Sequence, residues 1–326
     1  AEMLKSFPEV NVVNEGVLFT AHVTRKNTTW GLQRISQRPM VTVAGTASPT
    51  DPAYSYSYSD SKLGAGVDVY IVDTGINTAH KAFGGRASVG YSAYNSSDDG
   101  FGHGTHCAGT AASDAFGVAS KANLIAVKVL GDDGSGYSAD ILTGLDWVVK
   151  NHNARKTEAR FIGSVASMSW GYDYGRNDAV ESAITALVTA GIHSVVAAGN
   201  ENGDACTITP GALGGPSGPV LSVGAMNIDD YPSVFSNSGP CVDLYAPGEQ
   251  VLSTWIGSTT ATHVLDGTSM ATPHITGLIA YFLAANPSLR SPSVMKKYLT
   301  SHALPGLLHN RTGIIAGDIL TIANNG

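Results

Sequence analysis

Apolar runs rich in β-branched residues recur along the chain, each followed by glycine or by a stretch of helical length. They span residues 67–75, 122–130, 164–171, 191–200 and 220–226. Strands that are apolar on both faces need helices covering both faces, as in a parallel sheet. Two intervening stretches, 139–153 and 178–191, have the three-to-four apolar spacing of amphipathic helices. The chain is therefore predicted to have an α/β fold with a mostly parallel sheet, preferably as a single domain.

The composition argues against some classes of function, such as nucleic-acid binding. The 326 residues are 43% hydrophobic, which is enough for a large core, and the net charge of −7 offers no basic stripe for nucleic acid. No apolar run is long enough to span a membrane. We expect residues 41–66, with the sequence YSYSYSD, to form a surface loop with exposed tyrosines. Residues 7–21 are expected to form an isolated strand or hairpin.

The stretch DGTSMATPH (266–274) holds an aspartate, a serine and a histidine. Ser269 precedes an apolar run of helical length, so we expect it near a helix N-terminus, where unpaired amides favour negative charge. Ser269 is either a helix cap or a nucleophile that needs an adjacent base. The helical offset turns His274 away from Ser269, and Asp266 belongs to the local loop. An esterase of α/β-hydrolase type is excluded, because no histidine follows Asp318, the only later carboxylate.

Candidates for the base and the acid lie upstream. His103 stands between two glycines in GFGHGTHCAGT (100–110), which would let a substrate backbone approach the imidazole. His106, three positions on, is the competing candidate. Asp73 ends an apolar strand at its carboxyl end, where α/β folds collect functional groups, and a buried carboxylate there needs a partner such as an imidazole N–H. Asn200 ends a further strand and is either a turn residue or a donor to an oxyanion.

Four stretches occur in chain order: VDTG (72–75), GHGTHCAGT (102–110), AAGN (197–200) and GTSMATPH (267–274). Together they resemble the subtilisin-like serine proteases, whose chain order is aspartate, histidine, serine. Three further stretches resemble the proteinase K branch, and within it the fungal vacuolar, cerevisin-type proteases. These are WGLQRIS (30–36), GIHSVVAAGNENGDAC (191–206) and CVDLYAPG (241–248). The resemblance implies a seven-stranded, largely parallel sheet between helices and a serine endopeptidase of broad specificity.

By matching position, the resemblance implies a triad in which Asp73 orients His103, His103 is the general base, and Ser269 attacks the peptide carbonyl. Asn200 and the Ser269 amide would stabilise the oxyanion. The implied substrate-binding residues are Gly134, Ser135 and Gly136 at the groove edge, Ser169, Trp170 and Gly171 on one wall, and Ala198 and Gly199 on another. Protein and peptide substrates would bind as an added strand. Trp170 stands where relatives commonly carry leucine, so its indole is expected to reshape the primary pocket.

The resemblance also bears on metal and thiol chemistry. No cofactor is required for the reaction, but Asp243 matches a calcium ligand of related enzymes, so a structural calcium ion is expected there. The segment before it, 207–219, is longer and richer in glycine than the usual turn. Cys206 and Cys241 match a disulfide of relatives, and Cys107 matches a free thiol near the catalytic histidine. Mercurials would then inhibit by crowding His103.

The N-terminal residues resemble the tail of the family's inhibitory propeptide. We expect residues 1–23 to be that remnant, residues 24–326 to be the peptidase domain, and the mature N-terminus to fall between about Thr20 and Asn27. The enzyme is expected to be a monomer inhibited by its own propeptide. Sequons at Asn27, Asn95 and Asn310 and a disulfide favour the secretory pathway, with the fungal vacuole as the first expectation and secretion as the alternative. The alternative to an enzyme is a catalytically silent subtilase fold acting as a binding or antigenic protein.

Overall fold

The computed structural model describes residues 23–42, 45, 47–172 and 174–326. The strands are β1 (Val23–Thr28), β2 (Tyr54–Tyr58), β3 (Val67–Asp73), β4 (Ala87–Ser92), β5 (Asn123–Lys128), β6 (Gly163–Met168), β7 (His193–Ala197), β8 (Leu221–Met226), β9 (Leu244–Pro247), β10 (Val251–Thr254), β11 (Thr262–Leu265), β12 (Leu304–Pro305) and β13 (Thr321–Ile322). The α-helices are α2 (Trp30–Arg34), α3 (His103–Ala112), α4 (Ser138–Arg155), α5 (Asp178–Thr189), α6 (Thr268–Ala285) and α7 (Pro292–His302). Both predicted amphipathic helices are present, as α4 and α5.

The central sheet has nine strands in the order β12-β13-β9-β8-β7-β6-β3-β5-β4. All neighbours from β4 to β13 pair in parallel, and only β12 runs antiparallel. The α/β fold predicted from the apolar runs is therefore confirmed. Seven of the strands, β3 to β9, make up the sheet expected from the resemblance. The two-residue strands β12 and β13 extend it, because the C-terminal segment pairs along β9.

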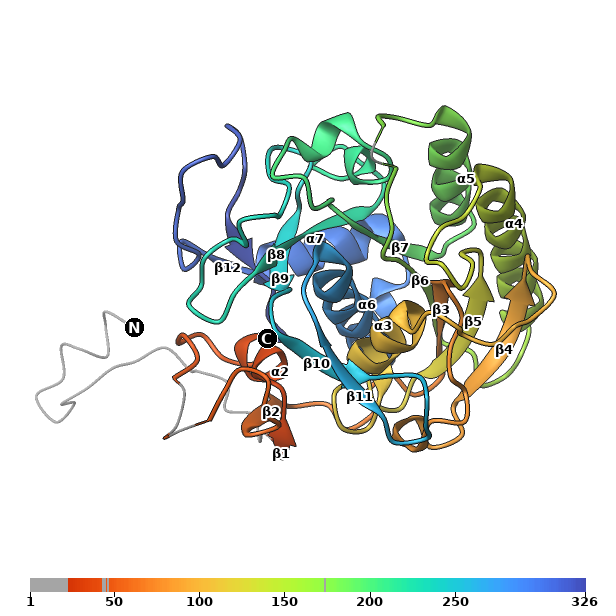
Figure 1. Ribbon diagram of the computed structural model, residues 1–326, viewed down its shortest axis with the longest axis horizontal. Helices are drawn as coiled ribbons and strands as arrows, with labels where there is room; N and C mark the ends of the chain where they lie inside the picture. Colours follow the sequence, from red (N-terminus) through yellow and green to blue (C-terminus); the bar gives the residue numbers. More distant parts are fainter. Residues whose placement is uncertain (1–22, 43–44, 46, 173) are drawn as a thin grey trace, which may run out of the picture.

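Helices cover both faces of the sheet, with α3 and α6 on one face and α4 and α5 on the other (Figure 1). Strand β3 shows how the sequence serves both layers. Val69 and Ile71 belong to the core on the α3 and α6 face, whereas Tyr70 and Val72 belong to the core on the opposite face. Burial on both faces explains why β3 is a continuous apolar run rather than an alternating one.

The expected surface loop over residues 41–66 is wrong for its central part. Residues Tyr54–Tyr58 form β2, which pairs antiparallel with β1, and the side chains of Tyr54 and Tyr56 are buried. The alternation Tyr-Ser-Tyr-Ser-Tyr has the period of two that puts tyrosines on one face of a strand. Burial of the phenol rings against the rest of the domain therefore makes this segment a strand, although its polar composition is typical of a loop. The strand or hairpin expected over residues 7–21 lies outside the described residues.

The fold brings the ends of distant elements to one edge of the sheet. Strand β3 ends at Asp73, β7 ends three residues before Asn200, and helices α3 and α6 begin at His103 and Thr268. Helices α3 and α6 pack against each other closely, since a Cβ at Gly277 would lie only 2.7 Å from the Ala111 carbonyl oxygen. Among the described residues, we find no helix that combines the length and the apolar character needed to cross a membrane.

Candidate active site

Asp73 and His103 form a hydrogen-bonded pair at the end of β3. The Nδ1–H of His103 donates to Oδ1 of Asp73 over 2.8 Å, and the carboxylate is 1% exposed. The Thr74 amide donates to the same oxygen over 2.8 Å, which fixes the carboxylate plane. With Nδ1 committed to Asp73, the neutral ring keeps Nε2 as its proton acceptor. The imidazole is therefore oriented and has a free basic nitrogen.

The environment of His103 tunes its basicity. Burial alone would lower the pKa of His103, but the charge and hydrogen bond of Asp73 and the contact with Cys107 outweigh burial and raise the pKa well above its ordinary value of 6.5. An imidazolium at this position is thus stabilised, as is required of a base that accepts a proton in a transition state.

The other two candidate histidines have local roles. His106 is fully buried and its Nε2–H donates to the carbonyls of Val251 and His263, while burial lowers its pKa to about 3. His274 is also fully buried, donates through Nδ1 to the Met270 carbonyl, and has a pKa lowered to about 4 by burial. Neither is part of the Asp73–His103 pair.

Asp99 ties the acid and the histidine together. Its Oδ1 accepts from the Thr74 hydroxyl over 2.8 Å and from the Gly102 amide over 2.7 Å, and its Oδ2 accepts from both the amide and the hydroxyl of Thr105. Thr74 follows Asp73, and Gly102 and Thr105 flank His103. One buried carboxylate therefore holds the end of β3 against the start of α3.

Ser269 is the second residue of α6, as expected for a serine near a helix N-terminus. Its hydroxyl donates to the Ser169 carbonyl over 2.9 Å, and no bond joins it to His103 among the described residues. The two elements are neighbours, because the Cys107 thiol lies 3.4 Å from the Ser269 carbonyl oxygen and 4.0 Å from Nδ1 of His103. The structure therefore gathers serine, histidine and aspartate with the serine hydroxyl turned towards Ser169.

The amide of Asn200 has a defined orientation. Its Oδ1 accepts from the Thr268 amide and the Thr268 hydroxyl, both over 2.9 Å. Because the oxygen is held by two donors, the Nδ2 donor points the other way, and it makes no bond within the described residues. Asn200 is exposed and lies beside the residue that precedes Ser269. An exposed N–H donor beside the helix end that carries Ser269 fits an oxyanion site.

The expected substrate-binding residues are only partly accessible. Ser135, Gly136 and Gly171 are exposed, whereas Ser169, Ala198 and Gly199 are buried. The Trp170 indole donates to the Val72 carbonyl over 2.8 Å and packs against the core on the α4 and α5 face of the sheet. It lines a cavity of about 290 Å³ together with Gly136, Tyr137, Ser138, Ile141, Gly171, Tyr172, Asn177, Val180 and Thr209. Ala198 and Gly199 do not line this cavity, so the indole shapes a different part of the groove from that wall.

Two places bring potential metal ligands together. Ligand atoms of Asp73, His103 and Cys107 lie within 4.8 Å of one another, but burial raises the pKa of the Cys107 thiol and keeps it protonated. Asp243 is buried, and its Oδ1 lies 2.9 Å from the Lys296 ammonium. Its Oδ2 accepts from the Gly215 and Ser222 amides. The carboxylate expected to bind calcium is thus already fully engaged, so these residues do not fit a metal ion.

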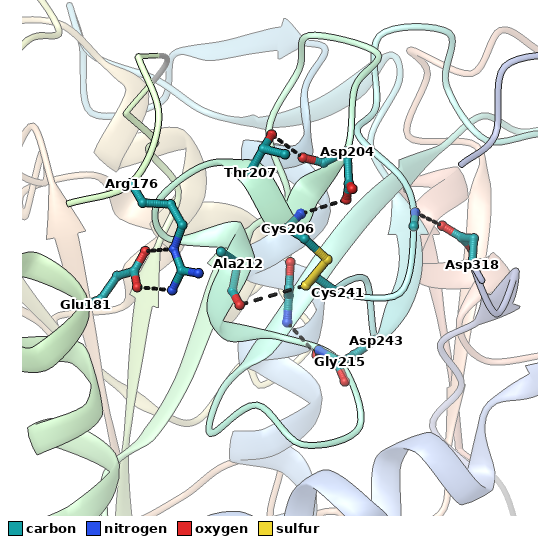
Figure 2. Close-up of a disulfide and its surroundings, with 12 residues drawn as sticks. Arg176, Glu181, Asp204, Cys206, Thr207, Ala212, Gly215, Cys241, Asp243 and Asp318 are labelled. Atoms are coloured by element: carbon teal, nitrogen blue, oxygen red, sulfur yellow. Dashed lines mark hydrogen bonds and ion pairs between the residues drawn. A yellow bond between two sulfur atoms is a disulfide. The ribbon is translucent and has the colours of Figure 1, made fainter. Parts of the chain in front are cut away.

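Cys206 and Cys241 form a disulfide (Figure 2). The bridge links the turn after Asn200 to the residue two before Asp243, and Cys107 is the free, buried thiol. This is the arrangement implied by the resemblance. Thr268 and Asp99, by contrast, escaped the sequence analysis. Asp99 stands in a run of two aspartates that reads as a polar loop, and only its burial reveals its role.

Comparison with known proteins agrees with the fold. The Subtilase family profile (Peptidase_S8) matches residues 64–314. The chain is 42% identical to the subtilisin-like serine protease pepC of Aspergillus niger over 94% of its own length and 58% of the relative's. It is 42% identical to alkaline protease 2 of Aspergillus fumigatus, again over 94% of its length and 63% of the relative's. The chain thus spans about three fifths of the length of these curated relatives.

Two further matches cover nearly the whole length of the matched protein. The subtilisin-like serine protease Rho m 2.0101 of Rhodotorula mucilaginosa is 40% identical over 94% of this chain and 90% of that protein. A crystal structure of a cold adapted subtilisin-like serine proteinase superposes with a TM-score of 0.76 at 36% identity, over 92% of this chain and 98% of that one. The chain therefore belongs to the subtilase family of serine peptidases.

Proposed function

We propose that the protein is a serine endopeptidase that hydrolyses peptide bonds through Asp73, His103 and Ser269. The observation that carries the proposal is the 2.8 Å bond from the His103 imidazole to a carboxylate that is 1% exposed, next to a serine at a helix N-terminus. A buried carboxylate that holds one nitrogen of an imidazole and leaves the other free is the arrangement that a general base beside a serine nucleophile requires. The pair therefore favours catalysis over a silent fold.

The chemistry starts at the serine hydroxyl. Ser269 leaves the Ser169 carbonyl by rotation about its Cα–Cβ bond and presents its proton to Nε2 of His103. As Oγ bonds to the substrate carbonyl carbon, His103 takes that proton and Asp73 stabilises the resulting imidazolium. His103 then gives the proton to the leaving amine, which leaves an acyl-enzyme on Ser269. Water, activated by the same imidazole, releases the acid.

The charge that develops on the substrate oxygen is stabilised at the start of α6. Nδ2 of Asn200 and the backbone amide of Ser269 are the proposed donors, and the helix dipole adds to their effect. The Thr268 bonds to Oδ1 of Asn200 keep the donor aimed before substrate arrives. Such preorganisation avoids reorganisation during the reaction.

We propose that extended protein and peptide segments bind along Gly134–Gly136 and Ser169–Gly171 as an added strand. Backbone contacts of this kind recognise main chain rather than side chains, which supports a broad specificity. Trp170 and Ile141 line the 290 Å³ cavity, so this cavity would take an apolar side chain.

Labelling and hydrolysis test the proposal together. The protein is treated with a fluorophosphonate probe, and turnover of a casein substrate is measured with and without the probe. We expect labelling at Ser269 and loss of turnover, with a Ser269→Ala variant as the unlabelled control. A folded protein that is neither labelled nor active would establish the silent alternative.

We propose membership of the proteinase K branch, close to the cerevisin-type proteases, a location in the secretory pathway with the vacuole first and secretion as the alternative, and a monomeric enzyme inhibited by its propeptide. All three sequon asparagines, Asn27, Asn95 and Asn310, are exposed, which supports their glycosylation. Shift of the band after endoglycosidase treatment tests this.

We propose that residues 1–23 are a propeptide remnant and that residues 24–326 form the peptidase domain. Strand β1 pairs with β2, and the Arg25 guanidinium donates to the carbonyls of Asp114 and Gly117. Cleavage inside β1 would break these contacts, so we expect processing near Val23, within the window expected from the sequence. N-terminal sequencing of the active enzyme tests it, and a start at Ala1 would refute it.

A further inference from the structure

Lys296, in the middle of α7, has its ammonium group surrounded by oxygen atoms of the protein. The ammonium of Lys296 donates to the carbonyl oxygens of Gly215, Gly218 and Val220 over 2.7, 3.0 and 2.5 Å. A fourth oxygen, Oδ1 of Asp243, lies 2.9 Å away. The Lys296 side chain is only 12% exposed, so these four oxygens replace most of its hydration. Lysine ammonium groups are normally solvated and lose this solvation only where oxygens replace it.

The oxygens come from two separate parts of the chain, a loop that supplies three carbonyls and Asp243, which supplies a carboxylate oxygen. We call residues 214–220 the glycine loop. It turns at Gly215, which has a φ of +77°, and the Gly218 amide closes the turn on the Gly215 carbonyl over 3.0 Å. Figure 2 shows Gly215 beside Asp243, whose Oδ2 the Gly215 amide contacts over 3.1 Å. The carboxylate thus organises the loop with one oxygen and faces Lys296 with the other.

Carbonyl and carboxylate oxygens converging on one point are the ligands of a hard cation. Calcium takes about six to eight such oxygens at about 2.3–2.6 Å. Here the centre is held by Nζ of Lys296, at 2.5–3.0 Å from each oxygen. An ammonium and a metal ion cannot share this position, both by volume and by charge repulsion. The donor set is therefore complete without a metal.

We propose that the Lys296 ammonium is a built-in cation that takes the place of a structural metal ion between the glycine loop and Asp243. The chain carries this cation on α7, so the loop is held without any ion from solution. This part of the molecule is then independent of calcium, in contrast to the expectation for Asp243 from the sequence. The proposal does not depend on the catalytic role of Ser269.

Solvent can reach the position if the lysine is removed. A cavity of about 560 Å³ is lined by Gly218, Asp243 and Lys296 among other residues, and Pro216 and Lys297 border it. Water from this cavity could complete the coordination shell of a metal in a variant that lacks the ammonium. Removal of the lysine should therefore convert the position into a calcium site.

The experiment compares thermal unfolding of Lys296→Met and Lys297→Met with the wild type, in EDTA and in millimolar CaCl2, after fluorophosphonate treatment to prevent autolysis. Lys297 is the matched control, because it is the exposed neighbour on the same helix. We expect the Tm of Lys296→Met to fall by on the order of 10 °C in EDTA, since Asp243 is left buried and unpaired. Calcium should restore much of this loss. Lys297→Met should follow the wild type in both buffers.

A second measurement covers the case in which Lys296→Met does not fold. Wild-type crystals soaked in MnCl2 are examined for anomalous scattering at this position. We expect the Lys296 side chain in density and no metal peak beside Asp243. A metal peak bound to Asp243 in the wild type, or a folded Lys296→Met whose Tm responds to calcium no more than that of Lys297→Met, would overturn the proposal.

Discussion

Replacement of Asp73 by asparagine tests the electrostatic part of the mechanism with little change of shape. Oδ1 of Asp73 accepts from both the Thr74 amide and His103, whereas Oδ2 has no partner. The asparagine side chain can therefore place its oxygen at the Oδ1 position, keep both bonds, and put its NH2 group where Oδ2 was. Asp73→Asn should thus remove the negative charge and keep the imidazole in place.

The size of the effect follows from the separation of the charges. A contact of 2.8 Å between Oδ1 and Nδ1 puts the centres of the carboxylate and the imidazolium about 4 Å apart, which corresponds to about 4 kcal/mol at an effective dielectric constant of about 20. Only the transition state contains the imidazolium, so the whole of this energy appears in the barrier. We expect kcat to fall by about 10³-fold with a small change in KM.

The pH profile provides the second readout. Because Asp73 raises the pKa of His103, the histidine is protonated and inactive as a base until the pH exceeds this raised value. The acid limb of kcat/KM in the wild type should therefore lie above pH 6.5, and in Asp73→Asn it should move to lower pH. Peptide hydrolysis is measured over the whole limb, with the exposed Asp98→Asn as a control for net charge. A loss of less than about tenfold together with an unmoved limb would refute the reasoning.

Three further predictions concern neighbouring groups. Asn200→Ala should lower kcat about 10²–10³-fold at little cost in KM, the range known for one such donor in a subtilisin, and steady-state kinetics with an unchanged kcat would exclude its oxyanion role. A mercurial should inhibit the wild type, because the Cys107 thiol lies 4.0 Å from Nδ1 of His103, while Cys107→Ala stays active and resists; equal inhibition of both would place the mercury elsewhere. Loss of the Cys206–Cys241 disulfide, which spans 35 positions, should cost about 4 kcal/mol in the free energy of unfolding, measured by urea denaturation with the oxidised enzyme as control, and an unchanged midpoint would contradict this.

Much of the fold could be predicted because its central strands are buried on both faces. Strands such as β3 and β5 need apolar residues at nearly every position, which produces runs that stand out in the sequence. Strand β2 was missed because its buried tyrosines alternate with serines and stand beside prolines, a composition typical of loops. Tyr56 is buried because it packs into the core on the α3 and α6 face, and those contacts join segments far apart in the sequence.

The same distinction explains what could be foreseen of the site. Asp73, His103, Ser269 and Asn200 stand in short motifs with glycine and small neighbours, so each is visible locally. Lys296 stands in the polar helix segment VMKKYL, where two adjacent lysines look equivalent. Lys296 reaches four oxygens of the glycine loop and Asp243, whereas Lys297 is exposed. Only the packing of α7 decides which of the two lysines faces these oxygens.

The geometry also shows how the site can be precise although its residues come from four elements. Asp99 binds Thr74 and the first turn of α3, so Asp73 and His103 are fixed relative to each other. Thr268 binds Asn200 and directly precedes Ser269, so the proposed oxyanion donor and the proposed nucleophile are fixed relative to each other. These two pairs approach each other where α3 packs on α6, because the Cys107 thiol contacts both His103 and the Ser269 carbonyl. The proposed mechanism then requires the Ser269 hydroxyl to rotate from the Ser169 carbonyl towards His103.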